Sequence, residues 1–177
     1  MYGVIWGMRF LALTVLVLAT PGWVSFRSAR YHYSVTYPSS WHRATRSLTP
    51  HLSDPHEILT VGTGLLPVGG PRCAQVPVNA LEAVGATGAL VTVQERAPTN
   101  ASGGFPPRPK RFKLRPTPSL EIPACLAPHG RPRLTWIAFR DHGRHFYALV
   151  ALGRSATSRT RDEATRVLDS LRVNPIR

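Results

Sequence analysis

Residues 133–152 read RLTWIAFRDHGRHFYALVAL and give the clearest indication of the architecture. Two largely apolar runs, 133–140 and 145–152, flank a polar tetrapeptide that contains Gly143. Runs of this length, rich in β-branched and aromatic residues around a glycine turn, are typical of a β-hairpin. The second run is apolar at odd and even positions alike, so we expect its strand to lie inside the sheet with material packed on both faces.

Three further segments have the pattern of strands. Residues 31–37 alternate aromatic or aliphatic with polar side chains, and residues 57–62 (EILTVG) and 89–94 (ALVTVQ) are short β-branched runs. Period-two alternation and β-branched runs bounded by Gly or Pro favour strands. Between the last two segments, Asn79 and Glu82 have capping-box spacing, which predicts a short helix that begins at Asn79.

The clearest helix pattern lies near the end of the chain. Thr160 and Glu163 again have capping-box spacing, and residues 164–171 (ATRVLDSL) place apolar side chains on one helical face. The dipeptide Asn174-Pro175 is expected to stop this helix. These elements predict a single α+β domain over residues 29–174, in which helices flank an antiparallel sheet.

An apolar segment precedes this domain. Residues 10–19 (FLALTVLVLA) follow Arg9 and precede a Thr-Pro-Gly sequence, which is the order of parts in a secretory signal. Residues 10–26 carry no charge, but they are fewer than the roughly twenty apolar residues of a membrane-spanning helix. Residues 1–26 therefore predict a signal peptide or an N-terminal membrane anchor, with membrane contact through 10–26 if uncleaved. The alternative is a start codon assigned too far upstream, which would leave a cytoplasmic domain.

The chain is strongly basic. Among its 177 residues, twenty Arg and two Lys oppose nine Asp and Glu, so the formal net charge is +13. Such a charge attracts phosphate backbones, anionic headgroups and acidic proteins. The Pro-rich segment 97–120 contains no acid, interleaves two Phe with cations, and is expected to be an exposed loop. Its cations are candidates for binding a polyanion or partner: Arg108, Lys110, Arg111, Lys113 and Arg115. Charges on a solvated loop contribute little stability, so we expect joint substitution of the five to leave folding intact.

Two cysteines and a few histidines are the remaining candidates for chemistry. Cys73 and Cys125 could form a disulfide in an oxidising compartment, although a pair of free thiols fits the sequence equally well. Imidazoles are common metal ligands, so four histidines are weak metal candidates. They are His51, His56, His142 and His145. No nucleophile elbow, P-loop or complete zinc-protease motif occurs, so no catalytic residue or cofactor is expected.

Two stretches resemble a known family. Residues 33–41 (YSVTYPSSW) are similar to the opening strand of PsbP-like proteins, and residues 164–171 are similar to their closing helix. The resemblance implies an antiparallel sandwich covered by helices, in a group that includes extrinsic photosystem subunits, Ran-binding Mog-type proteins and bacterial surface proteins or lipoproteins. Few members of this group are enzymes. The modified cysteine of the lipoprotein members has no counterpart near residue 20.

The sequence therefore predicts a non-enzymatic binding or accessory domain that is secreted or membrane-anchored outside the cytoplasm. Its expected partner is a protein or an anionic component of the cell envelope. One alternative is a cytoplasmic protein that binds nucleic acid or an acidic partner through the basic loop. A second alternative is a small metal-dependent enzyme built on the four histidines.

Overall fold

The computed structural model describes residues 22–70, 75–98, 104–116 and 132–175. In these residues, eight strands form two antiparallel sheets that are accompanied by two helices. The α+β class and the antiparallel pairing predicted from the sequence are therefore confirmed. Most of the predicted signal or anchor segment, Cys73 and Cys125 lie outside the described residues.

The larger sheet has five strands in the order β3-β4-β5-β7-β6. Its strands are β3 (His42–Arg43), β4 (His56–Gly62), β5 (Ala89–Arg96), β6 (Arg133–Asp141) and β7 (Arg144–Leu152). Strand β7 pairs with both β5 and β6, and buried side chains of β7 belong to apolar clusters on the two faces of the sheet. The prediction that this strand lies inside the sheet is confirmed.

The turn between β6 and β7 is tighter than the sequence suggested. Only His142 and Gly143 lie outside the strands, and both have positive φ angles, 49° and 74°. Two consecutive residues with positive φ match a type I′ hairpin turn, whose twist suits antiparallel strands.

The smaller sheet joins the two ends of the described chain. It has the order β1-β2-β8, formed by β1 (Trp23–Ser28), β2 (Tyr33–Pro38) and β8 (Arg172–Val173). All six residues of β1 pair with β2. The predicted signal or anchor includes residues 23–26 and the predicted domain begins at residue 29, whereas the structure places residues 23–28 in a strand of the sheet.

The C-terminal helix is displaced from its predicted position. Helix α2 covers Ser158–Ser170 and is capped by Thr157, whose hydroxyl accepts a hydrogen bond from the Thr160 amide at 3.1 Å. The prediction that Thr160 is the cap is wrong, because Thr157 satisfies that free amide first. The helix also ends before Asn174, because Arg172–Val173 leave it to pair with β2.

Helix α1 (Val78–Glu82) also begins without the expected cap. Its N-cap residue is Pro77, and no side chain caps the helix. The side-chain amide of Asn79 instead donates to the Val68 carbonyl oxygen at 3.3 Å. The capping role predicted for Asn79 is therefore wrong, because its amide holds the preceding loop.

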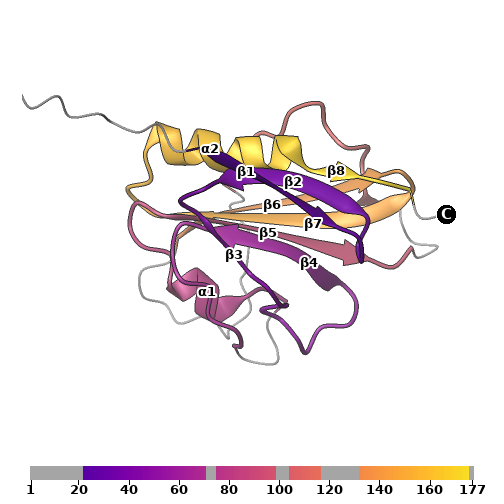
Figure 1. Cartoon of the computed structure of the whole chain (residues 1–177), viewed down its shortest axis with the longest axis horizontal. Helices are drawn as coiled ribbons and strands as arrows, with labels where there is room; N and C mark the ends of the chain where they lie inside the picture. The colour runs from indigo at the N-terminus through magenta and orange to yellow at the C-terminus, as the bar shows by residue number, and fades with distance from the viewer. Residues whose placement is uncertain (1–21, 71–74, 99–103, 117–131, 176–177) are drawn as a thin grey trace, which may run out of the picture.

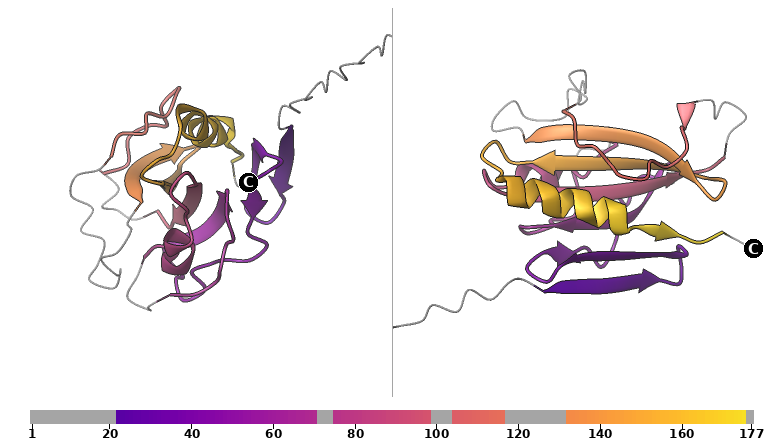
Figure 2. Two further views of the ribbon diagram at one scale, coloured as in Figure 1. Left: turned by 90° about the vertical axis from the view of Figure 1, so that its left-hand side faces the viewer. Right: turned by 90° about the horizontal axis from the view of Figure 1, so that it is seen from above.

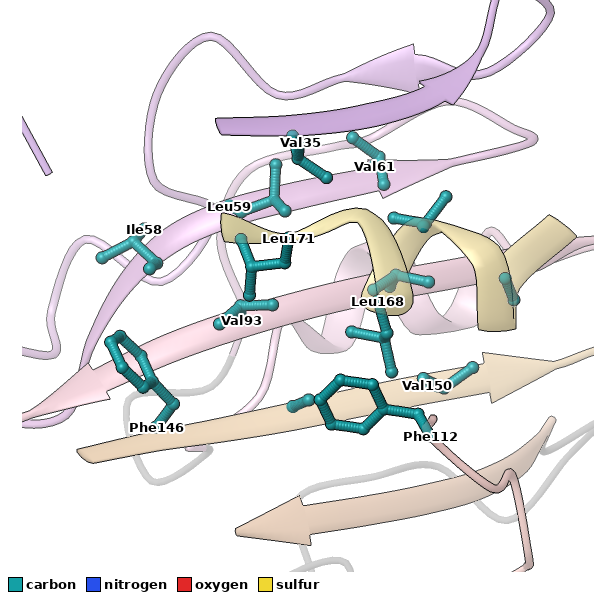
Figure 3. Packing of buried hydrophobic residues seen from close by; sticks show 14 of the residues in the cluster. Val35, Ile58, Leu59, Val61, Val93, Phe112, Phe146, Val150, Leu168 and Leu171 are labelled. Carbon is teal, nitrogen blue, oxygen red and sulfur yellow. The ribbon is translucent and has the colours of Figure 1, made fainter. Parts of the chain in front are cut away.

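The two sheets diverge, and helix α2 lies along the opening between them (Figures 1 and 2). The larger apolar cluster joins buried side chains of the two sheets to those of α2. Figure 3 shows Leu168 and Leu171 among the side chains of Val93, Phe112 and other members of this cluster. A second cluster on the opposite face of the larger sheet includes the buried residues of α1.

Arg144 connects the two sheets by polar contacts. Its side chain is only 7% exposed, and Nε and Nη2 donate to Glu95 Oε1 and Oε2, each at 2.7 Å. The same guanidinium donates to the backbone carbonyl oxygens of Tyr31 at 2.9 Å and Asn174 at 3.2 Å. A residue that the sequence placed in a polar turn is therefore buried where the β1–β2 turn, β5 and the C-terminal segment meet.

Candidate functional site

The segment 104–116 is held against the domain, and we call it the basic strap. Its two aromatic side chains are buried: Phe105 is stacked on His145 with ring centroids 4.7 Å apart, and Phe112 meets Phe139 edge-on at 5.3 Å. The strap lies on the β6 side of the larger sheet, across the molecule from the β1–β2 hairpin (Figure 2). The expectation of a fully exposed loop is therefore wrong for its aromatic residues, which join the core.

Backbone hydrogen bonds also fix the strap. The Arg108 amide donates to the Arg140 carbonyl oxygen at 2.9 Å, and the Arg140 amide donates to the Pro106 carbonyl oxygen at 2.8 Å. Further along, the Phe112 amide donates to Asp169 Oδ1 at 2.9 Å. The strap therefore follows the free edge of β6 and then the C-terminal end of α2.

Arg108 is a structural residue of this strap. Its side chain is 15% exposed, and its guanidinium forms an ion pair with Asp141 at 3.1 Å and donates to the carbonyl oxygens of Leu168, Asp169 and Leu171 at the end of α2. A cation is favoured there because the last helical carbonyls lack intrahelical partners and carry partial negative charge. The expectation that all five strap cations are solvated is wrong for Arg108, and joint substitution of the five should disturb folding.

The other four strap cations are exposed. They are Lys110, Arg111, Lys113 and Arg115. Within the part of the chain that the structure describes, their side chains have no hydrogen-bond or ion-pair partner. The strap therefore presents four cations over six residues, from a backbone that other contacts hold in place.

The histidines considered as metal ligands lie in separate environments. His145 is buried beneath Phe105, whereas His142 is in the exposed turn, 3.8 Å from Asp141 Oδ1. His56 Nε2 lies 3.6 Å from Glu95 Oε2, and His51 lies in an exposed loop. Over the described residues, no group of three or more His, Cys, Asp or Glu side chains is placed to hold a metal ion. The histidines therefore do not form the metal centre that was considered.

A pocket of about 730 Å³ lies between the β1–β2 hairpin and the β3–β4 edge of the larger sheet. We call it the hairpin pocket. Three elements supply its lining: the hairpin contributes Phe26, Ser28, Arg30, Tyr31 and Tyr33, the segment from β3 onward contributes Arg43, Ala44, Thr45, Arg46, Ser47, Pro50 and Leu52, and β4 contributes His56 to Thr60. No motif in the sequence indicates this pocket, because its walls come from three separate segments of the chain.

Among the described residues that line the hairpin pocket, Glu57 is the only acid. It is 5% exposed, and its Oε2 accepts hydrogen bonds from the Leu48 amide at 2.9 Å and from the Thr49 amide and hydroxyl at 3.1 and 3.0 Å. Its Oε1 accepts from the Thr60 hydroxyl at 2.7 Å. This carboxylate therefore holds the loop before β4, and both of its oxygens already accept hydrogen bonds inside the protein.

The arginines of the pocket use fewer of their hydrogen-bonding groups inside the protein than Glu57 does. The Arg43 guanidinium stacks on the Phe26 ring at 3.7 Å and donates to the Ala44 carbonyl oxygen at 2.9 Å. Arg30 lies over the Tyr31 ring at 5.0 Å. Arg46 is exposed and has no side-chain partner among the described residues. The pocket therefore has cationic groups with unused donors beside aromatic surface.

Tyr33 closes the pocket from the hairpin side. Its hydroxyl donates to the Ile58 carbonyl oxygen at 2.8 Å, and burial raises the pKa of Tyr33 to about 12. Desolvation disfavours the phenolate, so the side chain stays neutral and holds β2 against β4.

No family model, curated protein or solved structure matches this chain. The resemblance of residues 33–41 and 164–171 to PsbP-like proteins therefore stays a prediction. None of the helices in the described residues is long and apolar enough to cross a membrane.

Proposed function

We propose that the chain is a non-enzymatic, exported or N-terminally anchored binding domain of PsbP-like type, which contacts an anionic surface of the cell envelope through the basic strap. The observation that carries this proposal is the fixed backbone of the strap beneath four exposed cations. Phe105, Arg108 and Phe112 anchor the segment without using those cations.

A fixed strap favours binding because less conformational entropy is lost when the ligand arrives. Residues 110–115 contain four cations and no acid, so their fields add. Each Lys or Arg near an anionic membrane surface contributes about 1 kcal/mol, and this attraction decreases with salt. The net charge of +13 adds long-range attraction of the same sign.

The position of β1 is compatible with export. Cleavage after Ala19 would leave Trp23–Ser28 whole, so a mature chain that begins at Thr20 retains the β1–β2 pairing. The apolar run 10–19 contains no charged residue, which supports either a cleaved signal or an anchor.

Binding of single-stranded nucleic acid is the alternative, and one observation disfavours it. That interpretation needs aromatic rings on which bases can stack. Phe105 and Phe112, the two aromatic residues of the strap, are buried against the sheet and are not available to bases. Four cations without an aromatic platform suit a surface of closely spaced anionic groups better.

Co-sedimentation with vesicles tests the proposed contact. The purified chain is mixed with phosphatidylglycerol vesicles or with uncharged phosphatidylcholine vesicles at low and physiological salt. We expect salt-sensitive binding to the anionic vesicles only, and at least a tenfold loss of affinity when Lys110, Arg111, Lys113 and Arg115 are all changed to Gln.

The matched control removes four exposed cations elsewhere, by changing Arg27, Arg133, Arg154 and Arg161 to Gln. Its affinity should fall by less than about threefold, because only the general field is reduced. An equal loss in both variants would contradict a strap-specific contact. Tighter binding of the chain to single-stranded DNA than to the anionic vesicles, together with recovery of an intact chain from the cytoplasm, would favour the alternative.

A further inference from the structure

We propose that the hairpin pocket binds a small organic anion that carries an apolar, ring-containing portion. This site is separate from the basic strap, which lies on the β6 side of the molecule (Figure 2). The volume of about 730 Å³ is within the range of pockets that bury most of a small organic ligand.

The charge of the ligand follows from the lining. Of the residues that the structure describes, three arginines and one acid, Glu57, line the pocket. Glu57 is occupied by the Leu48 and Thr49 amides and by the hydroxyls of Thr49 and Thr60. A cationic ligand would therefore meet arginines without finding a free carboxylate. An anionic group would find guanidinium donors, which suit carboxylate, phosphate or sulfonate oxygens.

Two of the arginines have donors to offer. Arg46 has no side-chain partner among the described residues, and Arg30 contacts only the face of Tyr31 within the same part of the chain. Arg43 is fixed by stacking on Phe26 and by its bond to the Ala44 carbonyl oxygen, which together use only part of its five donors. The pocket thus combines one positioned guanidinium with two that are able to turn toward a ligand.

The apolar portion of the ligand follows from the remaining walls. Phe26, Tyr31, Leu52 and Ile58 line the same space as the arginines. The Tyr31 ring is held by a tilted contact with the His56 ring at 5.6 Å. Aromatic faces beside guanidinium groups accommodate a flat ring that carries an anionic substituent.

An adjoining pocket of about 290 Å³ is a weaker candidate. It shares Arg30, Tyr31 and His56 with the hairpin pocket, but it is also lined by Asp54 and Glu95. The Glu95 carboxylate is engaged by Arg144, and Asp54 Oδ1 accepts from the Ala97 amide. Its two carboxylates offset two of the three described arginines that line it, Arg30, Arg96 and Arg144, so this smaller space favours anions less than the hairpin pocket does.

Fluorescence titration with two dyes of one framework tests the proposal. The probes are 1-anilinonaphthalene-8-sulfonate and its uncharged counterpart N-phenyl-1-naphthylamine, each added to the full chain. We expect the sulfonate to bind at least tenfold more tightly. Arg46→Gln should weaken sulfonate binding by about fivefold or more and leave binding of the neutral dye within twofold, because one charge-assisted bond is lost.

The control is Arg27→Gln, which removes an exposed arginine of β1 that does not line the pocket. It should change sulfonate binding by less than twofold. Arg43→Met gives a second variant at the positioned guanidinium, and circular dichroism checks its fold. Equal binding of the two dyes, an Arg46→Gln affinity equal to wild type, or an equal loss in Arg27→Gln would each overturn the proposal.

Discussion

At the scale of single residues, Arg144 is the side chain whose removal should cost most. It forms a two-point ion pair with Glu95 and also donates to carbonyl oxygens from the hairpin turn and from Asn174. A buried guanidinium of this kind leaves an unpaired carboxylate and several unsatisfied carbonyls when it is lost. Its importance therefore arises from the groups left behind as much as from the bonds themselves.

We predict that Arg144→Met lowers the free energy of unfolding by about 3 to 5 kcal/mol, measured by urea denaturation. Arg133→Met, which removes an exposed arginine of the neighbouring strand, should stay within about 0.5 kcal/mol of wild type. The double variant Glu95→Leu with Arg144→Met should lose less unfolding free energy than the two single variants lose when their losses are added. A loss below about 1 kcal/mol in Arg144→Met would contradict this role.

Tyr33 makes the folding stability of the domain depend on pH in the alkaline range. Its pKa is about 12 in the folded state against an ordinary value of 10.0 for tyrosine, so between these values the folded chain keeps a proton that the unfolded chain has released. The stabilisation is complete below pH 10 and is lost as the pH rises toward 12. A shift of this size corresponds to roughly 2 to 3 kcal/mol.

The measurement is urea denaturation at a series of pH values from 8 to 12. We expect Tyr33→Phe to lose about 1 kcal/mol at pH 8, since the bond to the Ile58 carbonyl oxygen is removed, and to show a shallower alkaline decline. Tyr37→Phe, in the same strand, should keep the full decline because Tyr33 is unchanged. Equal alkaline slopes in all three proteins would exclude Tyr33 as the cause.

At the scale of elements, the basic strap and helix α2 stabilise one another. Arg108 supplies the partner that the last carbonyls of α2 need, and Asp169 of α2 accepts from the Phe112 amide of the strap. Neither element is complete alone, because the helix would have free carbonyls and the strap would have a free amide.

We predict that Arg108→Met destabilises the domain by about 2 kcal/mol or more and raises amide hydrogen exchange in both the strap and the last turn of α2. Arg111→Met should leave both observables near wild type, because this side chain is exposed and has no partner in the described residues. Unchanged amide exchange in the strap of Arg108→Met would contradict this prediction, because it would show that Phe105 and Phe112 hold the strap without Arg108.

Elements with a strong local pattern could be predicted, and elements defined by distant partners could not. The hairpin at 133–152 and the apolar face of α2 follow from periodicity within the segment itself. Strand β8 has two residues and exists because β2 lies beside it. Strand β1 follows an apolar run that resembles a leader. Its own residues do not indicate that it pairs with β2.

The candidate sites divide in the same way. The exposed strap cations could be identified from charge and proline content alone, since no tertiary contact defines them. Arg108 and Arg144 are arginines like most of those surface residues, and only the fold shows that Arg108 is partly buried and Arg144 is buried. The hairpin pocket is formed by three segments that only the fold brings together, so no motif in the sequence predicts it.

At the scale of the whole molecule, the two sheets depend on α2 and on the segment that follows it. The Ser170 hydroxyl donates to the Thr36 carbonyl oxygen at 3.0 Å and accepts from the Thr36 amide at 2.9 Å, so the end of α2 is bonded to the middle of β2. Val173 pairs with Tyr33, and the buried face of α2 completes the core between the sheets (Figures 1 and 3).

The pairing of β2 with β8 has a consequence for how the protein is made. The hairpin near residue 33 leaves the ribosome long before residues 158–174, yet it gains its third strand and its helical cover only from them. Contacts between such distant positions form slowly, because a long loop must close first. This domain can therefore complete its fold only after residues 158–174 have been synthesised, and until then β2 lacks both its third-strand partner and its helical cover.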